Sequence, residues 1–240
     1  MTGGAERSPT AVIALHGWGG EASSWRAWVA PIAQRGWQLA CAERGYGGQP
    51  PQLPGWDPGS ERRIVIAHSL GAHLLPEALW QQATDAVLLA GFASFLPSGR
   101  AGRALSAALR GMATQLEAGE AETSAMLREF FTRAAAPFPP AAESMELLQR
   151  GIPPQGRRRL LHDLEILATS AGLPPGLPPH IPVLLVEATD DRIVDAASRT
   201  ALREALPRAT VWPLERAGHS LRGAAGLPAA VLQWLADDPH

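Results

Sequence analysis

Lysine is absent from the sequence, so the 21 residues counted as Lys or Arg are all arginine, against 23 Asp and Glu. The formal charge of −2 gives no general attraction to nucleic acid or to an anionic membrane surface, and charge-driven recognition must be local. No glycine-rich segment is combined with a lysine and a hydroxyl residue, as a phosphate-binding P-loop requires. The composition therefore argues against nucleic-acid, membrane and P-loop functions.

Cysteine and long apolar runs are equally scarce. Cys41 is the only cysteine, so no intramolecular disulfide can form. No cluster of His, Cys and carboxylate residues has metal-ligand spacing, and we expect neither a metal nor a cofactor. No apolar stretch approaches 18 residues, and residues 1–10 lack the apolar segment of a signal peptide. A soluble, cytoplasmic and monomeric protein is expected.

Length and composition are those of a single enzyme-sized domain. The 240 residues are 46% hydrophobic, which is enough for a packed core. Short apolar runs alternate with segments of helical periodicity, and this alternation predicts a mostly parallel α/β sheet flanked by helices. The predicted strands cover residues 11–15, 37–42, 64–67, 87–90, 181–187 and 210–214, and the clearest helical patterns cover 23–33, 70–82, 196–206 and 227–235.

One stretch interrupts the alternation. Residues 93–171 carry Leu-, Ala- and Arg-rich helical patterns broken by Pro and Gly, without a strand signal. We therefore predict a helical lid of residues 93–171, inserted into a core made of residues 1–92 and 172–240. Residues 45–60 are rich in Gly and Pro, so we expect a loop there in place of the usual crossover helix.

The sharpest motif is Ala67-His68-Ser69-Leu70-Gly71, between a strand-like run and a helical pattern. Small residues two positions before and after a serine allow a tight strand-to-helix turn, a nucleophile elbow, which exposes the serine. The amide of Leu70, at the start of the helix, is a candidate oxyanion donor. Such a segment also arises by chance in an Ala- and Gly-rich chain, but the strand before it and the helix after it favour the elbow.

A glycine turn follows the first predicted strand, with the sequence His16-Gly17-Trp18-Gly19-Gly20. Glycines let the backbone approach a ligand closely. The amide of Trp18 is therefore our second candidate oxyanion donor, although a plain turn between strand and helix is the alternative. The side chain of His16 is expected to be structural.

An acid and a histidine follow the last two predicted strands, at the sheet edge where α/β active sites lie. Of the adjacent acids we prefer Asp190 for its spacing from the apolar residues that follow, which leaves Asp191 to solvent or to Arg192. His219 follows the final strand directly. With Ser69, these residues predict a Ser-Asp-His triad for acyl transfer to water.

The chain order Ser69, Asp190, His219 is that of the α/β-hydrolase fold, and we predict this fold with a helical lid. The histidines outside the triad are expected at the surface or in packing, although His68 could line the pocket. The same fold hosts several chemistries, so fold alone does not define the reaction.

The sequence resembles the pimeloyl-acyl-carrier-protein methyl ester esterases of biotin synthesis, patchily but over most of the chain. The similar segments are Leu15-His16-Gly17-Trp18-Gly19-Gly20 with Ser24-Trp25-Arg26, then Asp163-Leu164-Glu165-Ile166-Leu167, and Ile181-Pro182-Val183-Leu184-Leu185 before the acid loop. The resemblance implies hydrolysis of a methyl ester on a pimeloyl chain carried by acyl carrier protein. Ala67 departs from the usual glycine of the elbow.

Acyl carrier proteins are strongly acidic, so the resemblance implies a basic lid. Residues 100–159 contain nine Arg and six Glu, an excess of three positive charges. Phe130 and Phe131 are candidates for contact with the acyl chain, with core packing as the alternative. The candidates for carrier contact, with solvated helix faces as the alternative, are Arg128, Arg133, Arg150 and Arg157, together with Arg110, Arg158 and Arg159.

Two other functions remain open. A general carboxylesterase acting on small soluble esters would have the same triad without a protein partner. A hydrolase-fold protein that binds ligands without turnover is a third interpretation, which an intact triad disfavours.

Overall fold

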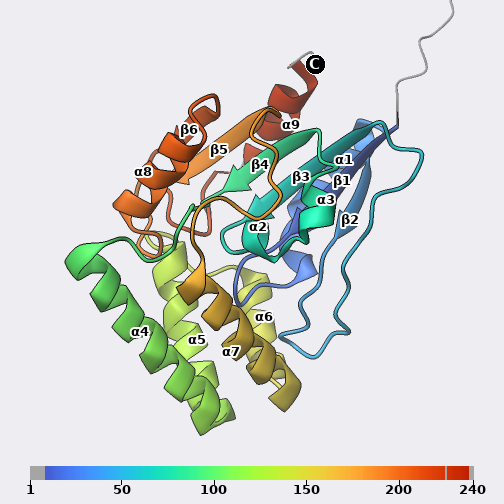
Figure 1. Cartoon of the computed structure of the whole chain (residues 1–240). Helices are drawn as coiled ribbons and strands as arrows, with labels where there is room; N and C mark the ends of the chain where they lie inside the picture. The colour runs from blue at the N-terminus through green and yellow to red at the C-terminus, as the bar shows by residue number, and fades with distance from the viewer. Residues whose placement is uncertain (1–8, 225, 238–240) are drawn as a thin grey trace, which may run out of the picture.

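The computed structural model describes residues 9–224 and 226–237, and it contains a six-stranded parallel sheet in the order β2-β1-β3-β4-β5-β6 (Figure 1). In-register pairs such as Ile13 with Val65 and Val87 with Leu184 join neighbouring strands. The runs of buried apolar residues in the sequence suit strands covered on both faces. The strands are β1 (Thr10–Leu15), β2 (Gln38–Cys41), β3 (Arg62–His68), β4 (Asp85–Leu89), β5 (Val183–Ala188) and β6 (Thr210–Leu214).

Helices cover the two faces of the sheet because successive strand side chains point to opposite sides. On one face, α1 (Arg26–Gln34), preceded by the 3-10 turn η1 (Ala22–Trp25), and α9 (Leu227–Asp237) pack on residues such as Val12. The opposite face, which includes Ile13, is covered by α2 (Gly71–Leu74), α3 (Glu77–Trp80) and α8 (Ala196–Ala205).

The helix predicted over residues 70–82 is two short helices in the structure. Leu75 is extended, with φ −75° and ψ 128°, and Pro76 follows it as the N-cap of α3. A residue before proline is driven out of the helical region, and proline itself cannot donate to the preceding turn. The chain therefore bends between α2 and α3.

Residues 42–61 connect β2 to β3 without a helix, as expected from their Gly and Pro content. An antiparallel bridge between Glu43 and Gln52 is the regular pairing within this connection. The connection runs beyond the sheet toward the helices drawn at the bottom of Figure 1.

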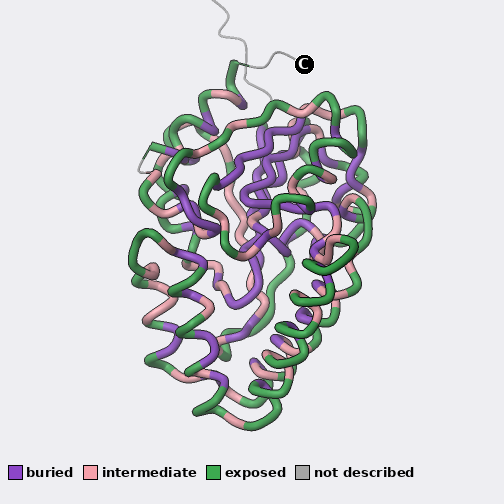
Figure 2. Tube along the Cα trace, turned by 90° about the vertical axis from the view of Figure 1, so that its left-hand side faces the viewer, coloured by how far each residue is buried: buried purple, intermediate pink, exposed green. Residues whose placement is uncertain are grey.

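Four helices lie between β4 and β5 along the chain, and we call them the cap helices: α4 (Gly99–Ala118), α5 (Glu120–Ala135), α6 (Ala142–Arg150) and α7 (Pro154–Thr169). They stand together beyond one end of the sheet (Figure 1). Their buried side chains, such as Leu109, Leu127 and Leu160, form a third apolar cluster with Trp18 and Leu70 from the sheet loops. Figure 2 shows buried and exposed stretches alternating along the cap helices.

None of the helices in the described part of the chain combines the length and apolar character that a membrane span requires.

Candidate active site

Ser69 occupies a tight turn between β3 and α2. Its φ of +53° is left-handed, a region that non-glycine residues rarely adopt. Two neighbours must be glycine for steric reasons. A Cβ at Gly71 would lie 2.7 Å from the carbonyl oxygen of Leu15, and one at Gly17 would lie 2.9 Å from the His68 ring. The predicted nucleophile elbow is therefore present in its geometry.

His219 reaches Ser69 from the loop after β6. Its Nε2 lies 2.9 Å from the Ser69 Oγ, and both side chains are buried. The loop packs against the end of α5, where Gly218 leaves no room for a Cβ beside the carbonyl of Ala136. The amide of Ser220 also donates to a carbonyl of α5. The sequence prediction that joins Ser69 with His219 agrees with this geometry.

The acid beside His219 is Asp191, and the prediction of Asp190 for this position is wrong. Nδ1 of His219 donates to Oδ2 of Asp191 at 2.9 Å. Asp190 is exposed, and its backbone amide donates to the carbonyl of Ala217. The side chain of the next residue, Asp191, is the one that contacts His219.

Asp191 is held as an anion within the protein. Burial opposes the charge, but the interactions with His219 and the amides of Val194 and Ile193 outweigh it, so the pKa of Asp191 lies below its ordinary value. Its Oδ1 accepts both amides, at 2.9 and 2.8 Å. An aspartate that caps the turn following it is a local signal that sequence reasoning could have used to choose this acid.

His68 supports the histidine loop and does not line the cavity beside Ser69. Its Nε2–H donates to the backbone carbonyl of His219 at 2.9 Å, and the two imidazole centroids are 5.0 Å apart. Burial, together with the nearby His219, lowers the pKa of His68 to about 4. His68 is therefore neutral near pH 7, and it fixes the His219 backbone without adding a charge.

The two amides expected to bind an oxyanion belong to residues close to Ser69. Leu70 follows it directly at the start of α2, and Trp18 follows Gly17, which packs on Ser69. No hydrogen bond from either backbone amide to an acceptor is found within residues 9–224 and 226–237. Unpaired amides beside a nucleophile are what an oxyanion hole requires.

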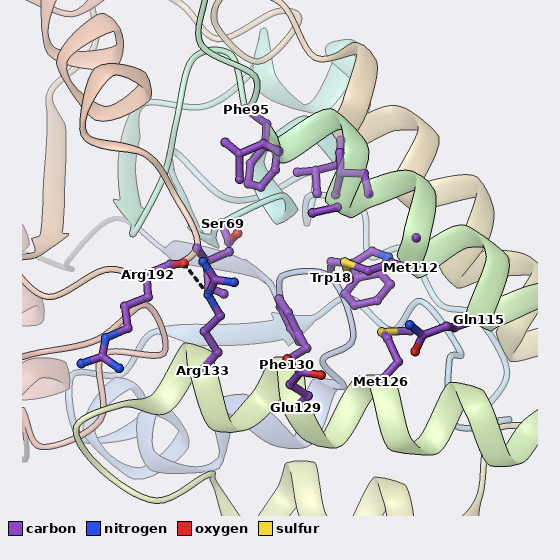
Figure 3. A pocket seen from close by; sticks show the side chains of 16 residues that line it. Trp18, Ser69, Phe95, Met112, Gln115, Met126, Glu129, Phe130, Arg133 and Arg192 are labelled. Carbon is purple, nitrogen blue, oxygen red and sulfur yellow. Dashed lines mark hydrogen bonds between the residues drawn. The ribbon is translucent and has the colours of Figure 1, made fainter. Parts of the chain in front are cut away.

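An apolar cavity of about 250 Å³ opens from Ser69 between α4 and α5 (Figure 3). Trp18 and Phe130 meet edge to face along it, with ring centroids 5.1 Å apart, and the Trp18 indole N–H donates to the carbonyl of Leu160 in α7. Phe131, by contrast, is buried against Gly19. Besides Ser69, Trp18 and Phe130, the wall includes Phe95, Leu109, Met112, Met126 and Ile193.

The arginines predicted for carrier contact have different surroundings in the structure. Arg133 lines the cavity with Ser69. Arg150 pairs with the buried Glu21, and Arg157 donates to a backbone carbonyl at 3.0 Å, so both are engaged inside the chain. Arg128 is exposed on α5 and does not line the cavity.

The remaining arginines named for this contact are similarly divided. Arg110 donates to Ser106 along α4, and Arg159 donates to the carbonyl of Gly45 at 3.0 Å. Arg158 is exposed on α7. Several arginines of this basic segment thus already have hydrogen-bond or ion-pair partners within the protein.

A buried ionic network near the site was not predicted from sequence. Asp163 in α7 accepts hydrogen bonds from Arg44 and from the Tyr46 hydroxyl, and its side chain is fully buried. Burial and the adjacent Asp163 hold the pKa of Tyr46 well above its ordinary value. The partners are more than 100 residues apart in sequence, so no local pattern could reveal them.

In the described part of the chain, no group of three His, Cys, Asp or Glu side chains is arranged to hold a metal ion.

The parallel sheet, the elbow after β3 and the acid and histidine after β5 and β6 define an α/β-hydrolase fold, and solved structures share it. An esterase from Exiguobacterium antarcticum superposes with a TM-score of 0.73 at 13% identity, covering 96% of this chain and 93% of its own.

Two further solved structures are similar over comparable lengths. A hydrolase from Oleispira antarctica has a TM-score of 0.72 at 11% identity, covering 95% of this chain and 92% of that one. A bromoperoxidase from Bacillus anthracis has a TM-score of 0.70 at 17% identity, covering 95% and 92%. No family model matches the sequence, and no curated protein matches it. At these identities the likeness establishes the fold alone.

Proposed function

We propose that the chain is a serine carboxylesterase with Ser69 as nucleophile, His219 as base and Asp191 as the orienting acid. One observation carries this proposal. Ser69, His219 and Asp191 form a continuous hydrogen-bonded chain that opens onto an apolar cavity. The similar structures include proteins described as esterases, which agrees with it.

Acylation follows from the direction of these hydrogen bonds. Nε2 of His219 accepts the Ser69 proton while Oγ attacks the ester carbonyl, and Asp191 stabilises the imidazolium that results. The amides of Leu70 and Trp18 bind the oxyanion. His219 then protonates the leaving alkoxide, which departs as an alcohol. Water, deprotonated by His219, attacks the acyl-enzyme and releases the acid and free Ser69.

For the natural substrate, the proposal is the methyl ester of pimeloyl-acyl carrier protein, and the cap helices would act as the lid. The sequence resemblance, the excess of arginine in residues 100–159 and the apolar cavity beside Phe130 support it. The cavity would hold the pimeloyl chain, and exposed cap arginines such as Arg128 and Arg158 would face the acidic carrier. In this role the enzyme would act in the cytoplasm.

A general carboxylesterase acting on small esters is the second candidate, and a specific observation favours it. Arg150 and Arg157, both expected to contact a carrier, are tied to Glu21 and to the carbonyl of Ile152. Fewer cap arginines are therefore free to attract an acidic partner.

The deciding experiment compares two substrates. Methanol release from pimeloyl-acyl-carrier-protein methyl ester and hydrolysis of p-nitrophenyl butyrate are measured with the purified protein and with Ser69→Ala. We expect Ser69→Ala to lose about 10⁴- to 10⁶-fold in rate on both substrates while retaining its fold. Full activity in Ser69→Ala would rule out the nucleophile.

The carrier is tested separately by charge reversal. Arg128→Glu and Arg158→Glu should lower the rate on the carrier substrate, and that rate should then depend less on salt concentration. Hydrolysis of the small ester should be unaffected. Arg208→Glu is the matched control, since Arg208 is exposed and lies before β6, outside the cap helices. Activity confined to the small ester would favour the general carboxylesterase.

A further inference from the structure

The final turns of α5 contact two of the loops that build the site. Phe131 packs on Gly19 beside Trp18, where a Cβ at Gly19 would lie 3.3 Å from the phenyl ring. The carbonyl of Ala134 accepts the amide of Ser220 at 2.9 Å, directly after the candidate base. The loop after β1, which contains Trp18, and the loop after β6, which contains His219, therefore both contact the same cap helix.

The same helix reaches the acid loop through Arg133. Its Nε donates to the carbonyl of Arg192 at 3.0 Å, and Arg192 directly follows Asp191 (Figure 3). Asp191 in turn accepts the amides of Ile193 and Val194, so residues 191–194 form one tight turn. The turn is therefore stabilised by hydrogen bonds to two side chains, that of Asp191 within it and that of Arg133 in α5.

We propose that Arg133 is a positioning residue that keeps Asp191 in register with His219 through the Arg192 carbonyl. The inference rests on the proposed ester hydrolysis, and it does not depend on a carrier protein. It assigns Arg133 a different role from the carrier contact expected from the sequence. The donor with a defined partner is Nε, whereas attraction to a carrier would depend on the positive charge.

This distinction selects the variants. In Arg133→Gln the amide nitrogen stands the same number of bonds from Cα as Nε, so the donor remains and the charge is lost. Arg133→Met keeps the length of the chain and loses both the donor and the charge. Arg103, an exposed arginine of α4 outside the cavity wall, is the control position for both substitutions.

On neutral p-nitrophenyl butyrate, positioning predicts that Arg133→Met lowers kcat about five- to tenfold with KM unchanged, as expected for one hydrogen bond near solvent. Arg133→Gln keeps the donor and should recover most of the kcat that Arg133→Met loses. A charge-based role predicts instead that Gln and Met behave alike. Equal losses in the two variants, a change in KM alone, or full activity in Arg133→Met would overturn the inference.

A measurement without substrate separates this inference from the proposed function. The low-field proton resonance of the His219 Nδ1–H donated to Asp191 is recorded by NMR in the parent protein and both variants. We expect it to be retained in Arg133→Gln and shifted or broadened in Arg133→Met, with Arg103→Met unchanged. If no ester were hydrolysed, the proposed function would fail, yet this resonance would still decide the role of Arg133.

Discussion

At the scale of single residues, Asp191 combines two tasks. One carboxylate oxygen closes the turn onto Ile193 and Val194, and the other receives the Nδ1–H of His219. Because that N–H is directed to an anion, Nε2 is left free to accept the proton of Ser69. The side chain therefore determines both the path of its loop and the tautomer of the base.

Replacing Asp191 by asparagine separates these tasks. The amide oxygen of Asp191→Asn can still accept the two backbone amides, but its –NH₂ donor turns toward Nδ1, which forces the imidazole proton onto Nε2. We expect kcat for p-nitrophenyl butyrate to fall about 10³- to 10⁴-fold, with an unchanged circular dichroism spectrum. Asp190→Asn is the matched control and should remain within about threefold, since Asp190 is exposed and the substitution keeps the backbone amide that donates to Ala217. The reverse ranking would restore Asp190 as the acid.

The choice between these two acids shows where sequence reasoning ends at this scale. Ser69 and His219 each have a local context, a strand before and a turn or helix after, that the sequence displays. Asp190 and Asp191 share the same context. Spacing does not separate them, and the feature that does is the turn that Asp191 caps by accepting the amides of Ile193 and Val194.

At the scale of elements, the connection from β2 to β3 is attached to the cap helices by charge. Asp163 of α7 accepts from Arg44 and Tyr46, both in this connection, and it is fully buried. Burial disfavours the charge on Arg44, but Asp163 outweighs it, so the pKa of Arg44 is raised. A segment without a crossover helix is thereby fixed to the neighbouring element.

Asp163→Asn should destabilise the fold by about 3 kcal/mol, because it leaves a partly buried guanidinium without its anion. The free energy of unfolding is measured by urea denaturation, with Glu165→Gln on the exposed side of α7 as control. The double variant Arg44→Met, Asp163→Leu should be more stable than Asp163→Asn alone. Equal stability of Asp163→Asn and Glu165→Gln would show that the network contributes nothing.

Elements are predictable where a single physical pattern governs them. The central strands can be found because they are buried on both faces and therefore form continuous apolar runs, as in Val183–Ala188. The break between α2 and α3 escapes the same reasoning because helical periodicity continues across Pro76 although the backbone does not. Propensity at that proline carries more information than periodicity.

At the scale of the whole molecule, buried histidines make stability depend on pH. Burial lowers the pKa of His16, His68 and His73, that of His68 to about 4. Between the unfolded value near 6.5 and these lower values, the unfolded chain binds more protons than the folded one, so stability rises with pH there. Stability is therefore lost as the pH falls below about 6.5.

For His68 alone this loss amounts to at most about 3 kcal/mol on reaching pH 4. We expect the midpoint temperature of thermal unfolding to fall as the pH is lowered from about 6.5 to about 4. In His68→Gln this fall should be smaller. His162→Gln, at an exposed position of α7, is the control. Identical pH dependence in the parent protein and His68→Gln would show that His68 is not protonated on unfolding in this range.

The arrangement of the cap arginines cannot be predicted from sequence at this scale. Nine arginines in residues 100–159 indicate a basic segment. Their partners, such as Glu21 for Arg150 and the Gly45 carbonyl for Arg159, lie in loops of the sheet and depend on the completed fold. Charge counts therefore overstate the number of cations that face a partner.

The placement of the cap helices has a consequence for how this architecture can diversify. The cap helices form the connection between β4 and β5, which are neighbours in the sheet. A connection of different length could therefore replace them without changing the strand register. The end of α5, however, fits Gly218 against the Ala136 carbonyl and Ser220 against that of Ala134. Cap helices exchanged between two proteins of this fold would therefore have to be exchanged together with the loop that carries His219. A change of substrate range by this route would involve both segments at once.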